Sequence, residues 1–198
     1  PSDAIVEAND EVEAATIAVG MINAGKADFL MKGKIQTSDL LKVVVDKEHG
    51  LRTGNVMSHM AIHEMKSYKK LIAVTDGGMM TYPDLDKKRQ ILENAVTTFR
   101  QMGYENPKVA VLTAIEKVNP KMPETVDADA LKQMSIDGTI TGCTVEGPIS
   151  YDLTMSVESA KIKGFDSPVT GDADIMLVSN IHVGNILSKG LIYSAGAK

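Results

Sequence analysis

The chain has 198 residues, of which 43% are hydrophobic and 24% are charged, and its formal net charge is −5. This length and composition are typical of a globular protein with a sizeable core, and the negative charge argues against a nucleic-acid-binding surface. The single cysteine, Cys143, excludes an internal disulfide and is typical of a cytoplasmic protein. No apolar stretch approaches the roughly 20 residues that a membrane-spanning helix needs, so we expect no membrane partner, and we expect no signal peptide.

The first elements that the sequence predicts are a helix, a short strand and a second helix. Apolar residues recur at helical spacing over residues 9–24. Residues 29–31 (Phe-Leu-Met) form an apolar run too short for a helix, which we interpret as a buried parallel strand. Thr37 and Ser38 follow a basic loop and are expected to cap a helix whose apolar residues lie within 40–45.

A polar connector over residues 46–55 predicts a domain boundary. Beyond it strands and helices alternate, which predicts an α/β fold with a mostly parallel sheet. The expected strands are residues 56–64, 71–75, 108–113, 139–145 and 175–179, and the first two are expected to pair. The expected helices are residues 81–102, 127–134, 152–161 and 183–193. The dipeptide Gly147-Pro148 is expected to break the chain.

Two segments have the composition of anion-binding loops. Gly33 lies between two lysines after the first predicted strand, and the helix that follows would present free backbone N–H groups. Asn180, Gly184 and Asn185 follow the last predicted strand and open the last helix. Ligands of open α/β sheets bind at such strand ends, although each segment alone is equally compatible with an ordinary helix cap.

Other candidate groups are Arg52 and two histidines. Arg52 lies between two glycines and could donate to an oxyanion, or could be an exposed arginine in a flexible loop. His59 and His63 are four residues apart, but their order is not HExxH and no third ligand is evident, so we predict no metal site. Asp76 and Asp152 follow strands without a partner and are given no catalytic role. Fingerprints of dinucleotide-binding, P-loop, serine-hydrolase and zinc-finger proteins are absent from the sequence.

Five further segments occur in order along the chain: GKADFLMKGKIQTSDLLK, GLRTGNVMSH, NPKMPETVDADALKQM, GPISYDL and SNIHVGNILSKGLIY. Together they resemble the phosphate butyryltransferases, also called branched-chain phosphotransacylases. The resemblance implies a three-layer α/β fold like that of isocitrate and isopropylmalate dehydrogenases, with two domains and a cleft between them. It places residues 1–48 and 181–198 in the first domain and residues 49–180 in the second.

The resemblance also implies an activity: reversible transfer of a short or branched acyl group between coenzyme A and inorganic phosphate. The expected partners are acyl-CoA, phosphate and acyl phosphate, together with a second copy of the chain in a homodimer. Coenzyme A would be a substrate, and no permanently bound cofactor is expected. Two alternatives stay open: an acyl carrier protein–phosphate acyltransferase, and a truncated non-catalytic module that binds coenzyme A or dimerises.

The family pattern assigns roles to individual residues. Gly33, Thr37, Ser38 and Lys42 would face coenzyme A and phosphate, and Asn180, Gly184 and Asn185 would lie on the loop that closes the cleft floor. We expect Asn180 and Gly184 to bind substrate. We expect Asn185, together with Arg52 for the chemistry of its side chain, to be catalytic. Lys42 stands where the family often has arginine. Tyr193 stands where acetyl-specific relatives have an active-site arginine, which favours the butyryl branch.

The resemblance implies further segments outside this chain. The family's serine-arginine motif and acidic general base would lie beyond the last helix, and an N-terminal α/β segment would precede residue 1. No Ser-Arg pair occurs in the sequence. We therefore expect the chain to be the middle of an enzyme, truncated at both ends and without its general base.

Overall fold

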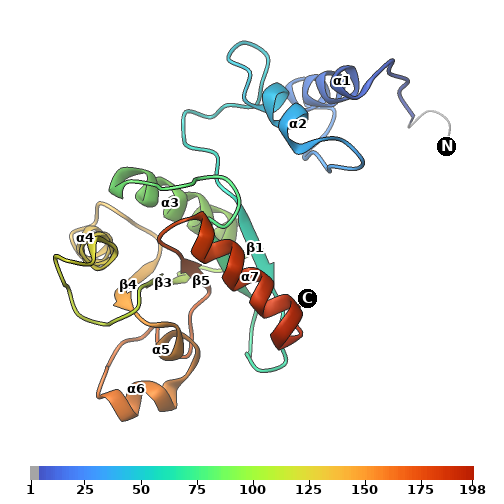
Figure 1. Cartoon of the computed structure of the whole chain (residues 1–198). Helices are drawn as coiled ribbons and strands as arrows, with labels where there is room; N and C mark the ends of the chain where they lie inside the picture. The colour runs from blue at the N-terminus through green and yellow to red at the C-terminus, as the bar shows by residue number, and fades with distance from the viewer. Residues whose placement is uncertain (1–4) are drawn as a thin grey trace. The chain divides into compact units, whose positions relative to one another are not determined.

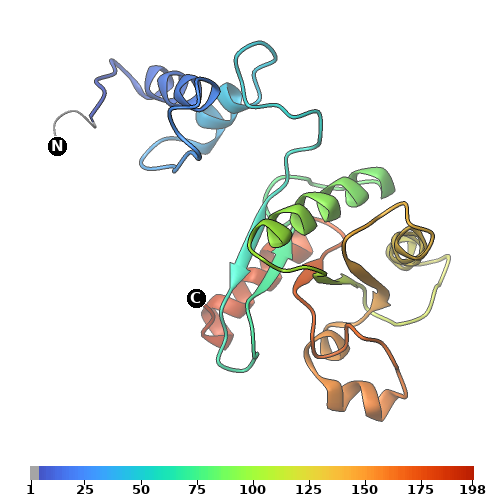
Figure 2. The ribbon, with the colours of Figure 1, turned by 180° about the vertical axis from the view of Figure 1, so that it is seen from behind.

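The computed structural model describes residues 5–198, which form two compact units divided after Asn55 (Figures 1 and 2). The first unit contains helix α1 (Glu11–Asn23) and helix α2 (Thr37–Val44), which pack against each other. Asp10 caps α1 by accepting a hydrogen bond from the Glu13 N–H at 2.8 Å. The two helices bury Ala15, Val19 and Leu40 between them.

The strand predicted at residues 29–31 is wrong. Phe29 is 78% exposed and Met31 is 86% exposed, and the described part of the first unit contains helices but no strand. A strand requires a neighbour that pairs with its backbone N–H and C=O groups. No such neighbour lies within residues 5–55, so the apolar run stays in irregular structure.

The second unit, residues 56–198, is built on a five-stranded sheet with the order β1-β2-β5-β3-β4. The strands are β1 (Met60–His63), β2 (Ile72–Thr75), β3 (Lys108–Leu112), β4 (Thr144–Ile149) and β5 (Ile175–Leu177). β1 and β2 pair antiparallel, as neighbours, and the other three pairings are parallel. Both the predicted pairing of the first two strands and the mostly parallel sheet are confirmed.

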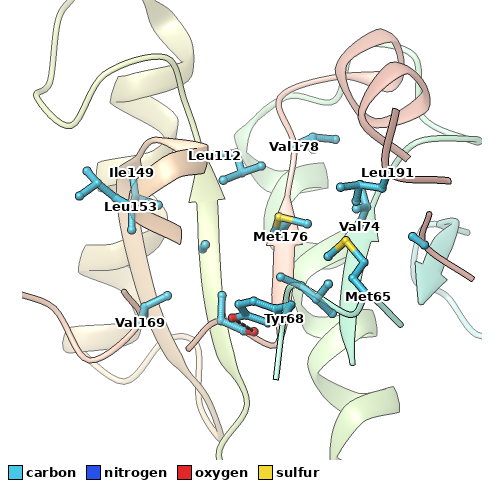
Figure 3. Close-up of a cluster of buried hydrophobic side chains, with 14 of the residues drawn as sticks. Met65, Tyr68, Val74, Leu112, Ile149, Leu153, Val169, Met176, Val178 and Leu191 are labelled. Carbon is cyan, nitrogen blue, oxygen red and sulfur yellow. Dashed lines mark hydrogen bonds between the residues drawn. The ribbon is translucent and has the colours of Figure 1, made fainter. Parts of the chain in front are cut away.

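Helices cover both faces of this sheet. They are α3 (Leu85–Gln101), α4 (Pro123–Ile136), α5 (Tyr151–Met155), α6 (Val157–Lys163) and α7 (Ile181–Ala195). Val109 and Val111 of β3 pack in one buried cluster with residues of α3 and α4, whereas Leu112 packs on the opposite face with residues of α5 to α7. Figure 3 shows the second cluster, with Met176 of β5 near Leu191 of α7. The alternation of side chains along buried strands therefore produces three layers.

β4 lies further along the chain than predicted, and it includes the Gly147-Pro148 dipeptide that we expected to break the chain. β4 pairs only with β3 and is an edge strand, a position where the missing N–H of a proline is tolerated. Gly147 lies so close to its neighbours that an added Cβ would be 2.8 Å from the Val111 Cβ atom. The glycine therefore allows close packing of the strand rather than ending it.

Two predicted helices also have different bounds. α4 begins at Pro123 rather than residue 127, because proline is well accommodated in the first turn of a helix. The single helix predicted over residues 152–161 is two helices, separated by Ser156 in an extended conformation. The Ser156 hydroxyl accepts a hydrogen bond from the Ser159 N–H at 3.2 Å and so caps α6.

The C-terminal helix lies in the second unit. Leu191 and Ala197 belong to the buried cluster that contains Leu112 and Met176. The backbones of Lys198 and Glu64 exchange two hydrogen bonds of 3.0 Å. The family resemblance grouped residues 181–198 with residues 1–48 instead, and that two-domain division stays a prediction. Among the residues described, no helix combines the length and apolar character needed to cross a membrane.

Candidate functional site

A pocket of about 410 Å³ lies in the second unit at the carboxyl ends of β3 and β5. Strand ends of this kind are where open α/β sheets hold their ligands. Leu112 and Thr113 form one side of the pocket, and Val183 and Leu187 of α7 form another. The remaining lining residues are Ala114, Met122, Glu124, Tyr151 and Ser179. Most of the lining is apolar, which suits the uncharged part of a small molecule.

Asn180 fixes the start of α7 beside this pocket. Its side-chain oxygen accepts hydrogen bonds from the His182 N–H at 3.1 Å and the Val183 N–H at 3.2 Å. These bonds satisfy two of the N–H groups that a helix leaves free at its first turn. Asn180 is therefore the helix cap that the sequence suggested as the alternative to ligand binding.

Gly184 and Asn185 hold α7 against the loop that follows β2. A Cβ atom on Gly184 would lie 2.6 Å from the Gly77 Cα atom, so only glycine allows this backbone contact. The Asn185 side-chain amide donates to the Gly77 carbonyl oxygen at 3.4 Å. Gly184 and Asn185 thus have structural roles that the sequence did not predict.

Asp76 organises the loop around Gly77. The buried carboxylate of Asp76 accepts hydrogen bonds from the N–H groups of four residues: His59, Gly78, Met79 and Met80. A carboxylate that accepts several backbone hydrogen bonds orders a loop strongly. Asp76 therefore has a structural role that the sequence did not predict.

A polar network beside the pocket was missed by the sequence analysis. The Ser150 hydroxyl lies within hydrogen-bonding distance of Glu116 and, at 2.6 Å, of Asp152, and its one proton is shared between the two carboxylates. Lys163 lies 3.0 Å from both carboxylates. The hydrogen bond from Ser150 is the largest effect that lowers the pKa of Glu116 and of Asp152. Both groups are therefore held ionised, and the network ties the loop after β3 to α6. The sequence feature that could have indicated this network is the position of Ser150 directly after a strand.

The predicted residues of the first unit lie in and around α2. Gln36, rather than Thr37 or Ser38, is the N-cap residue, and it makes no side-chain capping bond. Thr37 and Ser38 lie in the first turn, with both side chains exposed. The predicted cap was wrong because the helix begins one residue earlier than the hydroxyl pattern indicated.

Gly33, Lys42 and Arg52 are also exposed. A Cβ atom on Gly33 would meet nothing within 4 Å, so packing among the described residues does not require glycine there. Lys42 forms an ion pair with Asp39 at 3.0 Å and borders a hollow of about 850 Å³ between α1, α2 and residues 46–50. No ion pair joins Arg52 to another residue in the described range.

The two histidines considered as metal ligands have different environments. His59 is exposed and lies against Gly78, while His63 is buried in β1. Over residues 5–198, no group of three or more His, Cys, Asp or Glu side chains is arranged to hold a metal ion.

The sequence model of the phosphate acetyl/butaryl transferase family matches residues 4–198 of the chain. The chain belongs to this family. Among its relatives, the phosphate butyryltransferase of Clostridium acetobutylicum is 44% identical over 194 residues, which cover 98% of this chain and 64% of that protein. The phosphate acetyltransferase of Thermotoga maritima is 45% identical over 186 residues, covering 94% of this chain and 63% of that protein.

Solved structures of the transferase family agree with this assignment. The branched-chain phosphotransacylase from Enterococcus faecalis V583 matches with a TM-score of 0.90 and 38% identity, over 98% of this chain and 69% of that one. The chain spans about 64% of the length of the C. acetobutylicum transferase. The resemblance to the phosphate butyryltransferase family that the sequence segments indicated is confirmed.

Proposed function

We propose that this protein exchanges a short or branched acyl group between coenzyme A and inorganic phosphate. The observation that carries the proposal is the match to the transferase family over residues 4–198. An apolar pocket at the carboxyl edge of the sheet, beside the start of α7, supports it. An α/β fold with this sheet is compatible with many chemistries, so the family match rather than the fold selects this one.

The proposed reaction needs no nucleophile from the enzyme. The coenzyme A thiol loses its proton and its sulfur attacks the carbonyl carbon of the acyl phosphate. A carbon–sulfur bond forms through a tetrahedral oxyanion, and the carbon–oxygen bond to phosphate breaks as phosphate leaves. The enzyme supplies a base, hydrogen-bond donors for the oxyanion and a binding site for the phosphates.

We propose Arg52 and Asn185 as the residues that contact the reacting groups. Arg52 is exposed and its guanidinium group has the geometry to bind a phosphate or oxyanion through two N–H groups. The Asn185 amide is exposed and its hydrogen bond to Gly77 is long, at 3.4 Å, so exchanging that bond for one to a substrate oxygen costs little.

The remaining residues are proposed for substrate binding in two different ways. Gly33, Thr37, Ser38 and Lys42 would bind coenzyme A or phosphate directly, through backbone N–H groups, hydroxyls and charge. Asn180 and Gly184 would act through the backbone that they position, because the Asn180 oxygen and the Gly184 Cα are already engaged within the unit.

The proposal is tested by measuring thiol release from butyryl-CoA in the presence of phosphate, for the full-length enzyme and for its Arg52→Ala variant. Loss of one oxyanion donor typically costs about 10²–10³ in kcat, so we expect a decrease of at least about tenfold in kcat/KM. Arg100→Ala is the matched control, because Arg100 is also an exposed arginine but lies in α3. Unchanged kcat/KM in Arg52→Ala would remove Arg52 from the site, and absence of exchange in the full-length enzyme would refute the activity.

The two-domain dehydrogenase-like architecture, the homodimer and the cytoplasmic location stay predictions. Light scattering of the purified protein at several concentrations tests the dimer, with a mass of twice 21.2 kDa expected. A monomer at all concentrations would contradict it.

A further inference from the structure

We propose that the pocket lined by Met122, Val183 and Leu187 holds the hydrocarbon chain of the acyl group. On this view, Met122 and Val183 determine the length of the chain that the protein accepts. This inference rests on the proposed acyl exchange, and it assigns the part of the substrate that the exchange chemistry itself does not touch.

The chemistry of the pocket favours a hydrocarbon over a phosphate group. Glu124 is the one charged side chain among the nine lining residues, and no lysine or arginine lines the pocket. A phosphate placed there would meet a carboxylate and no cation, which is unfavourable in a partly dry site. An alkyl chain gains free energy from the same apolar walls, because it leaves water without losing hydrogen bonds.

The size of the pocket fits this role. Its volume of about 410 Å³ lies within the usual range for small-molecule sites, roughly 300–1,000 Å³. A four-carbon acyl chain fits with room for the adjoining thioester or phosphate ester at the opening. An acetyl group would leave most of the apolar lining uncovered.

Identity over the whole chain does not decide the acyl length. The chain is 44% identical to a phosphate butyryltransferase and 45% identical to a phosphate acetyltransferase. Overall similarity therefore does not set the acyl preference, and local lining residues are the part of this chain that can. One methylene group in an apolar site is worth about 10- to 200-fold in discrimination, so a change of one wall residue is large enough to produce the difference.

Met122 and Val183 are the lining residues best placed to change the pocket without disturbing the fold. Met122 is half-buried at the start of α4, and its flexible side chain can adapt to chains of different shape. Val183 is 42% exposed, so a larger side chain there can extend into the pocket rather than into the core. Its backbone N–H donates to the Asn180 side-chain oxygen at 3.2 Å, which fixes the direction of the Val183 side chain.

The test uses Val183→Phe to fill the pocket and Met122→Ala to enlarge it. The matched control is Ile192→Phe, because Ile192 is also 42% exposed on α7 and does not line the pocket. For each protein, kcat/KM is measured with acetyl-CoA, butyryl-CoA and hexanoyl-CoA in the presence of phosphate. Calorimetry with the thioethers S-methyl-CoA and S-butyl-CoA adds a binding measurement that does not depend on turnover.

We expect Val183→Phe to lower the butyryl-to-acetyl ratio of kcat/KM by at least about tenfold, and Met122→Ala to raise the hexanoyl-to-butyryl ratio by a similar factor. The same variants should shift the preference for S-butyl-CoA over S-methyl-CoA in the same directions, and Ile192→Phe should change neither. Ratios within about twofold of wild type in both variants would overturn the pocket assignment alone. If Val183→Phe does not fold, the hexanoyl-to-butyryl ratio of Met122→Ala alone tests the pocket assignment. A full-length wild type that neither exchanges acyl groups nor binds coenzyme A would instead refute the proposed function.

Discussion

The backbones of Gly77 and Gly184 are in direct contact: a Cβ atom added to Gly184 would lie 2.6 Å from the Gly77 Cα atom. Gly77 belongs to the loop after β2, and Gly184 lies in the first turn of α7. The two residues are more than 100 positions apart in the sequence. Their contact sets the position of the helix that forms one wall of the pocket.

Gly184→Ala should destabilise the protein. Alanine is normally favoured over glycine within a helix by about 1 kcal/mol, but here its methyl group would overlap the Gly77 backbone. We expect the overlap to outweigh the helix preference and to lower the free energy of unfolding by about 1–3 kcal/mol, measured by urea denaturation. Gly190→Ala is the control on the same helix, because nothing lies within 4 Å of a Cβ atom there. An equal gain in the free energy of unfolding in both variants would contradict the close contact between Gly77 and Gly184.

Asn180→Ala should weaken α7 at its first turn. It removes the acceptor for the His182 and Val183 N–H groups, and loss of such a cap costs about 1 kcal/mol. Asn180→Asp keeps a side-chain oxygen in the same place and should remain close to wild type. Gln36→Ala provides the comparison for α2, where the capping residue makes no side-chain bond and where we expect almost no change. A loss in Gln36→Ala as large as in Asn180→Ala would argue against the capping role.

Asp172→Asn should destabilise the amino-terminal edge of the sheet. The Asp172 carboxylate lies 2.8 Å from Lys69, 3.1 Å from Lys70 and 2.5 Å from Lys108. Burial alone would raise the pKa of Asp172, but the hydrogen bonds from Lys108, Lys69 and Lys70 outweigh burial and hold the pKa well below its usual range. A hydrogen bond to a charged group contributes about 1.5–3 kcal/mol, so we expect at least this loss at pH 7.

The pH dependence of this effect follows from the lowered pKa. The contribution of Asp172 is fully present above the unfolded-state pKa of about 4, and it is lost as the pH falls further toward the folded-state value. The difference between wild type and Asp172→Asn should therefore shrink below about pH 4. Asp129→Asn, at a half-buried helical site whose carboxylate accepts one 3.5 Å bond from Gln133, should cost little because no lysine or arginine pairs with it among the described residues. A difference for Asp172→Asn that stays constant with pH would contradict the ion-pair role.

His63 should make the protein less stable in mild acid. Its side chain is buried, and its Nε2 atom has no hydrogen-bond partner within the described residues. Burial disfavours the charged imidazolium and lowers the pKa of His63. The unfolded chain therefore binds more protons below about pH 6.5, and the free energy of unfolding falls as the pH decreases through this range.

His63→Leu isolates this contribution. The variant should lose less free energy of unfolding than the wild type between pH 7 and pH 5, measured by urea denaturation at each pH. His49→Leu is the control, because the His49 side chain is 86% exposed. Identical pH slopes for His63→Leu and wild type would show that His63 is protonated equally in both states.

Local patterns predicted much of the second unit. The alternation of apolar segments over residues 56–198 predicted each of its five strands near the observed place, because period and length are properties of neighbouring residues. They did not predict that Pro148 would lie in β4, since tolerance of proline depends on being at the sheet edge. They also predicted a strand at residues 29–31, where no partner strand exists within the described part of the first unit.

The sequence likewise predicted one part of the candidate site and missed another. The Asn180 cap could be read from the sequence, because a capping bond joins residues two or three positions apart. The pocket could not, since its walls come from the ends of β3 and β5, from the starts of α4 and α5, and from α7. β5 is the last strand in the chain but lies between β2 and β3 in the sheet. That insertion depends on burying apolar faces formed by residues far apart in the sequence, and only the tertiary structure decides it.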